Sequence, residues 1–238
     1  MPPEPQRVGG GLRIYFVDDA IIVVPVRNFV LFPGIVLNKP SGLLSVPGRG
    51  ADKQDCVSAR VQAVYNDARV VHRLDMATSG LMVMARGATM QRLLNEAFAT
   101  RQVTKHYEAL VHGRLPIARD SWREIELPIG VDWPNRPRRV IDWEHGKAST
   151  TLVCGVAFDA QLHATHVKLQ PLTGRTHQLR IHLQAIGHPI LGDQLYAPPH
   201  VAAMAPRLRL NASALSFMHP ASGDSMGFMF EGYGFEPA

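Results

Sequence analysis

The sequence predicts an α+β fold from two sets of segments. Apolar or alternating segments of strand length recur along the chain, at residues 14–17, 20–24, 29–37, 68–71, 81–85, 103–111, 151–156 and 165–169. Fewer segments have the character of helices, and these lie at residues 58–65, 89–98 and 176–186. This mixture of strands and helices favours the α+β class.

The composition is that of an ordinary globular protein. The chain has 238 residues, of which 46% are hydrophobic and 19% are charged, so it can bury a core as one large domain or two small ones. The formal net charge of +5 would attract a polyanion such as nucleic acid. An excess of this size often reflects only a solvated surface, so charge alone does not decide the partner.

The cysteines and the N-terminus predict a cytoplasmic protein. Cys56 and Cys154 form no CxxC pair, which favours a reducing compartment. No apolar run reaches the length of a membrane span, and the opening residues 1–5 lack the form of a signal peptide. Residues 1–12 are rich in proline and glycine, so we expect a mobile lead-in there.

Side chains that favour helix ends place two of the helices. Thr89 is a plausible N-cap for a helix with an apolar face of Leu93, Leu94, Ala97 and Phe98. Thr176 is a plausible N-cap for a second helix, and Gly187 stands where a C-terminal glycine stop belongs. The core stripe of this second helix would be Leu179, Leu183 and Ile186.

Arg180 is the next residue in the sequence after Leu179 of that stripe. It lies about 100° round the helix from Leu179, and therefore at the edge of the buried face. Because a buried arginine seldom goes unpaired, we expect an acidic partner for it.

A polar loop between two apolar segments is the best candidate for chemistry. It reads Val71-His72-Arg73-Leu74-Asp75-Met76-Ala77-Thr78-Ser79-Gly80-Leu81, and the segments on either side are expected to be buried strands. Asp, Thr, Ser and Gly favour loops because their short side chains bond to nearby backbone or permit positive φ. Two strands would hold such a loop still while a substrate reaches it. Asp75 is therefore either a reactive carboxylate or a residue that only closes a turn.

Four elements of the chain resemble the RluA family of RNA pseudouridine synthases and occur in that family's order. They are Lys39-Pro40-Ser41-Gly42, then His72-Arg73-Leu74-Asp75 with Thr78-Ser79-Gly80, then Lys105-His106-Tyr107, and finally Gly174-Arg175-Thr176-His177-Gln178-Leu179-Arg180. The resemblance covers residues 38–230, and one match could be chance whereas four in order are not.

The resemblance implies a pseudouridine synthase fold. This would have a mixed, mainly antiparallel sheet with flanking helices and a central RNA-binding cleft. Residues 38–238 would form the catalytic domain, with no appended S4 domain. Residues 1–37 would be a lead-in, in which residues 25–37 look like an apolar insert that the family does not normally carry.

The resemblance also implies roles for individual residues. Asp75 would be the catalytic nucleophile, Tyr107 would pack on the target base, and Arg180 would pair with Asp75. Tyr107 could instead be an ordinary half-buried strand aromatic. The expected substrate-binding residues are His72, Arg73, Thr78, Lys39, Lys105, Arg175, His177 and Arg136.

A basic loop narrows the resemblance to one subtype of the family. Asp132-Trp133-Pro134-Asn135-Arg136-Pro137-Arg138-Arg139 and Gly146-Lys147-Ala148 resemble a bacterial subtype that modifies a tRNA anticodon loop and a hairpin of 23S rRNA, and we expect a monomer. Prolines restrict the loop, its arginines can bind phosphate, and Trp133 could stack on a base. A loop of this composition is also common on plain surfaces.

The sequence predicts neither a metal site nor a cofactor. It contains no glycine-rich phosphate loop, dinucleotide fingerprint, HExxH or Cys/His quartet, and His177 and His182 are five residues apart. Isomerising a uridine needs no redox group, because a carboxylate nucleophile can carry a covalent intermediate. One departure from the family is Asn211, which stands where a histidine is usual and cannot titrate.

Two other classes of function remain open at this point. A non-catalytic RNA-binding protein could keep the fold, although Asp75, Tyr107 and Arg180 are all present. A glycosidase would need a second catalytic acid. Glu108, Glu144 and Asp193 offer no obvious pairing for that role.

Overall fold

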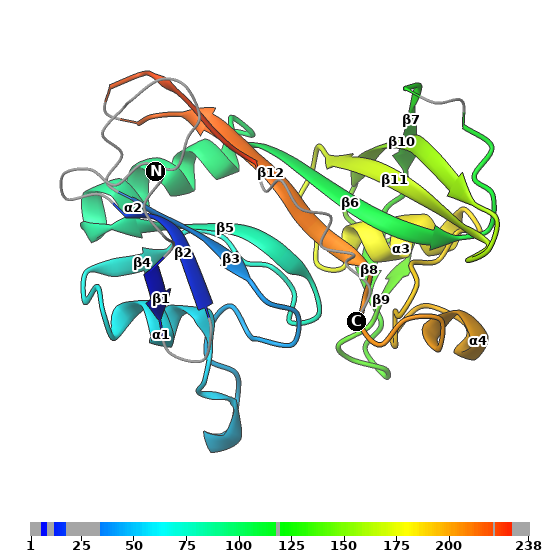
Figure 1. Ribbon diagram of the computed structural model, residues 1–238, viewed down its shortest axis with the longest axis horizontal. Coiled ribbons are helices and arrows are strands. Elements are labelled where there is room, and N and C mark those ends of the chain that lie inside the picture. Colours follow the sequence, from blue (N-terminus) through cyan, green and yellow to red (C-terminus); the bar gives the residue numbers. More distant parts are fainter. Residues whose placement is uncertain (1–5, 9–11, 18–33, 118–119, 221, 230–238) are drawn as a thin grey trace. The chain divides into compact units, whose positions relative to one another are not determined.

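Two units make up the chain, and each has its own strands and core (Figure 1). The computed structural model describes residues 6–8, 12–17, 34–117, 120–220 and 222–229. The first unit comprises Met1–Thr104 and Ala212–Tyr233, and the second comprises Lys105–Asn211 and Gly234–Ala238.

An antiparallel sheet forms the first unit. Its strands follow the order β1-β2-β3-β5-β12, with β4 beside β5 and β13 beside β12. An isolated parallel bridge joins Leu44 to Cys56. The strand bounds are β1 (Gln6–Val8), β2 (Leu12–Val17), β3 (Gly34–Lys39), β4 (Ala68–Val70), β5 (Ser79–Arg86), β12 (Leu210–Met218) and β13 (Ser225–Met229).

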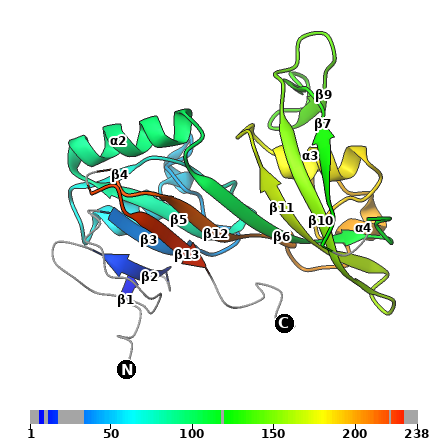
Figure 2. The same cartoon turned by 90° about the horizontal axis from the view of Figure 1, so that it is seen from above.

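The core of this unit lies between the sheet and α2 (Gly87–Ala99), which runs along one face of it (Figure 2). Because side chains alternate along a strand, β5 sends Leu81, Val83 and Ala85 toward α2. Met82 and Met84 of the same strand are also fully buried, so β5 is covered on both faces. The predicted buried strand at residues 81–85 is therefore confirmed, whereas β4 buries only Ala68 fully.

One prediction about the ends of this unit's elements is wrong. Thr89 is not the N-cap of α2, because the chain passes from β5 at Arg86 straight into the helix through Gly87 at φ 73°. Within the predicted lead-in at residues 1–12, residues 6–8 form β1, which pairs with β2, whereas residues 1–5 and 9–11 lie outside the described residues. The expected segment at residues 58–65 forms a helix, α1 (Val57–Gln62), with the Cys56 thiol at its N-cap and a 3-10 turn, η1 (Ala51–Lys53), before it. The predicted strand at residues 20–24 and the expected insert up to residue 33 lie outside the described residues.

The second unit contains an antiparallel sheet of order β6-β11-β10-β7 and a separate two-stranded hairpin. Helix α3 (Gln178–Ala185) contacts β9, β10 and β11, and α4 (Pro199–Ala202) is a single turn. The strands are β6 (Thr104–His112), β7 (Trp122–Glu126), β8 (Ile129–Val131), β9 (Arg139–Ile141), β10 (Thr150–Asp159) and β11 (Ala164–Pro171). The predicted α+β fold with a mainly antiparallel sheet is confirmed.

Helix α3 begins later than the sequence predicts. Its N-cap is His177, in the left-handed region at φ 59°, and not Thr176. Gly187 ends the helix at φ 85°, and its N–H binds the Gln184 carbonyl as expected for a C-terminal stop. Ile186 is 37% exposed, because the helix ends there and the side chain leaves the predicted core stripe.

No helix within the described ranges is long and apolar enough to cross a membrane.

Candidate active site

The loop at residues 71–78 joins the antiparallel neighbours β4 and β5 and carries Asp75. Four successive backbone carbonyls, from Leu74 to Ala77, accept hydrogen bonds. The Thr78 N–H binds the Asp75 carbonyl at 3.1 Å within the loop. Three groups of the segment after β3 bind the others: Ser45 Oγ to Leu74 at 2.6 Å, Gly42 N to Met76 at 2.8 Å and Ser41 Oγ to Ala77 at 2.7 Å. The backbone on both sides of Asp75 is therefore fixed.

Lys39 also binds the backbone of this loop, and it does so from the interior of the unit. We call this set of hydrogen bonds to the loop carbonyls the clamp. Its side chain is fully buried, and Nζ donates to the carbonyls of Pro40 at 2.9 Å, Leu43 at 2.7 Å and Met76 at 2.9 Å. Burial lowers the pKa of Lys39 to about 8, while the Asp75 carboxylate opposes this by favouring the ammonium form. The expected role of Lys39 in binding RNA does not fit this position, because all three N–H groups are used on backbone. Lys39 holds the loop instead.

Gly80 lets β5 start close to another strand. It has φ 116°, and a Cβ there would collide with the backbone of Ala212 in β12. Any other residue at this position would push the end of the Asp75 loop away from β12.

The other candidates in this loop differ in their exposure. His72 Nε2 accepts the Val83 N–H at 3.0 Å, and its ring stacks on Phe98 at 4.6 Å, so His72 holds the start of the loop. Thr78 is buried, with 3% of its surface exposed. Arg73 is exposed and forms no hydrogen bond or ion pair within the described part of the chain, so its guanidinium is available to a ligand.

In the second unit, β6 carries Lys105 and Tyr107, which lies opposite Leu169 of β11. Tyr107 is partly buried. Burial lowers the pKa of Lys105, whose Nζ lies against Gly174 in the loop before α3. The exposed Arg175 of the same loop reaches the Ala148 carbonyl at 3.4 Å. Lys105 and Arg175 therefore lie on neighbouring segments, and their expected role in binding the substrate stays a prediction.

Arg180 of α3 is buried and paired, as expected, but its partner is a residue to which the sequence assigns no role. Its guanidinium binds the Asp193 carboxylate through two bonds, at 2.8 and 2.5 Å, with both side chains at most 4% exposed. Asp193 Oδ1 also accepts the N–H groups of Leu195 at 2.9 Å and Tyr196 at 3.1 Å. The pairing of Arg180 with Asp75, which lies in the other unit, stays a prediction.

The basic loop between β8 and β9 is well ordered by its own hydrogen bonds. The Asp132 carboxylate accepts the Asn135 N–H at 3.2 Å and its amide nitrogen at 3.0 Å, and the Arg138 N–H binds the Asn135 carbonyl at 3.0 Å. The Arg136 guanidinium lies 4.8 Å from the centre of the Trp133 ring, which is 67% exposed. The loop thus presents an aromatic ring with a cation on one of its faces.

Residues 34–185 match the family model of RNA pseudouridylate synthases. The chain is 48% identical over 227 residues to the dual-specificity RNA pseudouridine synthase RluA of Escherichia coli (strain K12), covering 95% of this chain and 94% of the relative. It belongs to the RluA family of RNA pseudouridine synthases.

Two further relatives agree with that assignment. The RluA enzyme of Pasteurella multocida (strain Pm70) is 46% identical over 194 residues, covering 82% of this chain and 87% of the relative. Among solved structures, human RNA pseudouridylate synthase domain containing 1 is 25% identical, with a TM-score of 0.73 over 97% of this chain and 86% of the other. The predicted family and enzyme class are confirmed.

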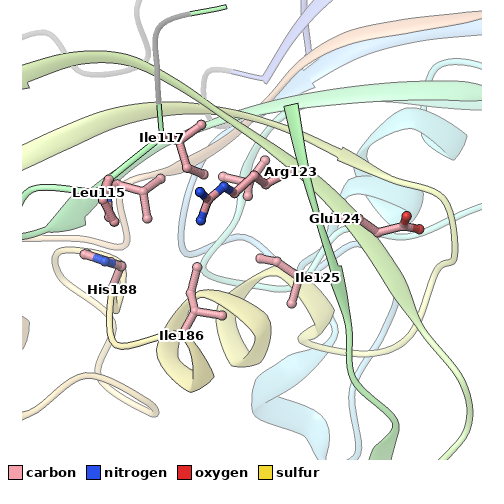
Figure 3. A pocket seen from close by; sticks show the side chains of 9 residues that line it. Leu115, Ile117, Arg123, Glu124, Ile125, Ile186 and His188 are labelled. Carbon is pink, nitrogen blue, oxygen red and sulfur yellow. The ribbon is translucent and has the colours of Figure 1, made fainter. Parts of the chain in front are cut away.

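A cavity of about 200 Å³ in this pseudouridine synthase is lined by none of the candidate residues. Arg123 and Ile125 of β7 point toward it and Glu124 points to the other side of the strand (Figure 3). The remaining lining is mostly aliphatic: Leu115, Pro116, Ile117, Val153, Ile186 and His188. Its size is below the range of about 300–1,000 Å³ of typical small-molecule sites. Among the described residues no group of three or more His, Cys, Asp or Glu side chains could hold a metal ion.

Proposed function

We propose that this enzyme converts specific uridines in RNA stem-loops to pseudouridine, with Asp75 as the nucleophile. The substrates would be a tRNA anticodon loop and a hairpin of 23S rRNA, consistent with the dual specificity in the names of its relatives. The observation that carries the proposal is the fixed backbone of the Asp75 loop, in which every carbonyl from Leu74 to Ala77 is bonded. A turn residue without a function would not need such a clamp.

The reaction breaks the bond between uracil N1 and ribose C1′ and forms a bond from C5 to C1′. The proton on C5 is lost and N1 gains one, so substrate and product are isomers. A carboxylate that forms a covalent intermediate divides this rearrangement into easier steps. The carboxylate of Asp75 would attack in that role, and nearby cations would hold its negative charge in place. Lys39 supplies one such charge, and Arg180 is the expected second. Tyr107 would stack on the uracil.

RNA would reach this site with its uridine turned out of the stack. Turning a base out costs on the order of a few kcal/mol, and less when the base is already unpaired. Arg73 lies two residues from Asp75 and is exposed, so we propose that it occupies the space the base leaves. Lys105, Arg175, His177 and Arg136 would contact the RNA around it. We also infer that the enzyme is a cytoplasmic monomer, with its catalytic domain over residues 38–238.

A defined RNA pair tests the substrates. The purified enzyme is incubated with a short anticodon stem-loop and with a 23S rRNA hairpin, and pseudouridine is mapped by carbodiimide adduct and primer extension. We expect modification of one loop uridine in each RNA and none in the same hairpins with that uridine replaced by cytidine. Modification of neither RNA, with activity on another structured RNA, would leave the enzyme class intact and overturn the dual substrate.

Arg73→Ala should slow the reaction on an ordered stem-loop more than on a short unstructured RNA of the same local sequence. A side chain that fills the space left by the uridine stabilises the RNA with that base turned out. Only the ordered stem-loop has to be unstacked for this. If Arg73 only binds phosphate, the reaction rates on both RNAs would fall by the same factor. The slope of binding affinity against salt concentration would also fall by about one unit. Single-turnover rates on the two RNAs at several salt concentrations separate these outcomes.

Trp133→Ala should weaken RNA binding by about tenfold, since stacking on an aromatic ring contributes about 1–3 kcal/mol per base. Trp143→Ala is the matched control. Trp143 is even more exposed, at 76%, but its neighbours Asp142 and Glu144 are acidic and repel a phosphate backbone. Fluorescence anisotropy with labelled stem-loop gives both affinities. Equal affinities for the two variants would remove the loop between β8 and β9 from the RNA-binding surface.

A further inference from the structure

Tyr196 lies at the meeting point of α3 and the β8–β9 hairpin. It is 7% exposed and packs in one apolar cluster with Ile129 and Ile181. Its hydroxyl lies 2.6 Å from His177 Nδ1 and 2.9 Å from the Arg139 backbone nitrogen. The guanidinium of Arg180 lies 4.9 Å from the centre of its ring, and that of Arg138 lies 5.7 Å from it. One side chain therefore contacts the N-cap and the arginine of α3 as well as the end of the basic loop.

One of the two hydrogen bonds of the hydroxyl has a defined direction. The Arg139 N–H can only donate, so the Tyr196 oxygen accepts from it. His177 Nδ1, 2.6 Å away, can accept the hydroxyl proton. A neutral His177 that accepts at Nδ1 carries its own proton on Nε2, on the side of the ring away from Tyr196. A hydroxyl that donates to Nδ1 therefore favours one of the two tautomers.

His177 also has an unusual backbone conformation. Its φ of 59° lies in the left-handed region, which is uncommon for residues other than glycine. Residues held in such regions concentrate at functional sites, where the surrounding structure maintains them. The bond to Tyr196 is one such restraint, and Gln178 supplies another by accepting the Arg175 N–H at 3.0 Å.

We propose that Tyr196 is a positioning residue of this pseudouridine synthase. Its hydroxyl holds His177 in the tautomer that donates from Nε2, and it ties the loop that carries Trp133 and Arg136 to the helix that carries Arg180. This proposal rests on the proposed function, in which His177 and Arg136 contact RNA. Phenylalanine would fill the same apolar space, so packing alone does not account for the hydroxyl.

Tyr196→Phe removes the hydroxyl and keeps the ring under both guanidinium groups. We expect kcat to fall about tenfold, which corresponds to the loss of one to two hydrogen bonds, while KM changes by less than about twofold. Tyr65→Phe is the matched control, because Tyr65 also lies against an arginine, Arg86, but belongs to the other unit and has no part in the proposed machinery. Its kcat should equal that of the wild type.

The tautomer is measured without RNA. Long-range ¹H–¹⁵N spectra distinguish Nδ1 from Nε2, and the loss of one histidine signal in His177→Gln assigns residue 177. We expect the Nε2–H form in the wild type and a mixture in Tyr196→Phe. A mixture in the wild type, or no change in the variant, would overturn the positioning role whatever the substrate is. If the tautomer of His177 changes in Tyr196→Phe as expected but kcat does not change, the result would count against an RNA contact of His177.

A second pair of variants tests the donor if Tyr196→Phe folds poorly. His177→Gln keeps an N–H donor near the position of Nε2, whereas His177→Asn keeps its amide near Nδ1. Asparagine suits a left-handed backbone better, so stability favours the Asn variant. Higher kcat in the Gln variant would support the Nε2 donor, and higher kcat in the Asn variant would contradict it.

Discussion

Asp75→Asn should abolish pseudouridine formation, with a loss of at least about a thousandfold in turnover, because removing the nucleophile of a covalent mechanism removes its chemical step. Asparagine keeps the shape of the side chain and lacks its nucleophilic charge. The substitution leaves the hydrogen bonds to the loop's backbone carbonyls in place, so the variant should fold and bind RNA within a few-fold of the wild type. Single-turnover assays and anisotropy measure the two properties separately.

The conditions of that assay follow from Lys39. Its pKa is about 8 and is supported by the Asp75 carboxylate, so Asp75→Asn should lower this pKa further. An assay at about pH 6.5 lies well below the wild-type pKa, which leaves room for a lower pKa in the variant while the ammonium stays protonated. Asp52→Asn, a change at an exposed residue of η1, is the matched control and should keep full activity. Substantial turnover by purified Asp75→Asn would end the nucleophile assignment.

Arg180→Met should destabilise the protein by about 3–5 kcal/mol, because it leaves the Asp193 carboxylate buried without its partner. Arg92→Met, at an exposed position of α2, should change stability by less than about 0.5 kcal/mol. Urea denaturation at neutral pH gives both free energies of unfolding. A wild-type midpoint for Arg180→Met would mean that the buried ion pair contributes nothing to the fold.

A double variant separates the structural role of Arg180 from its role in catalysis. In Arg180→Met/Asp193→Asn the stranded charge is gone, and the new amide would still offer an oxygen to the N–H groups of Leu195 and Tyr196. We expect it to recover more than about 1 kcal/mol of the lost stability, since removing both charges of a buried pair costs less than removing one. Activity should stay low if Arg180 also supports Asp75. Recovery of activity together with stability would confine Arg180 to the fold.

Local sequence was enough where neighbouring residues decide the structure. The apolar run at residues 81–85 became the fully buried core of β5, and Gly187 ended α3 as its position predicts. The start of α3 was misplaced because His177 takes up a left-handed conformation beside Tyr196, a contact between residues 19 positions apart. For α2, the strand before it sets where the helix begins, whereas Thr89 suggested a later start.

By itself the sequence determined the α+β class, the family and the position of Asp75, since these depend on residue order and local pattern. Tertiary structure decided which groups surround the candidate residues. Lys39 binds the Met76 carbonyl from 37 residues away, and Tyr196 binds the Arg139 N–H from 57 residues away. Lys39 was expected to bind the substrate, whereas in the fold its buried ammonium donates to three backbone carbonyls. The physical reason is that a buried donor has to find an acceptor in the fold, and sequence spacing does not show which strand or loop will supply it.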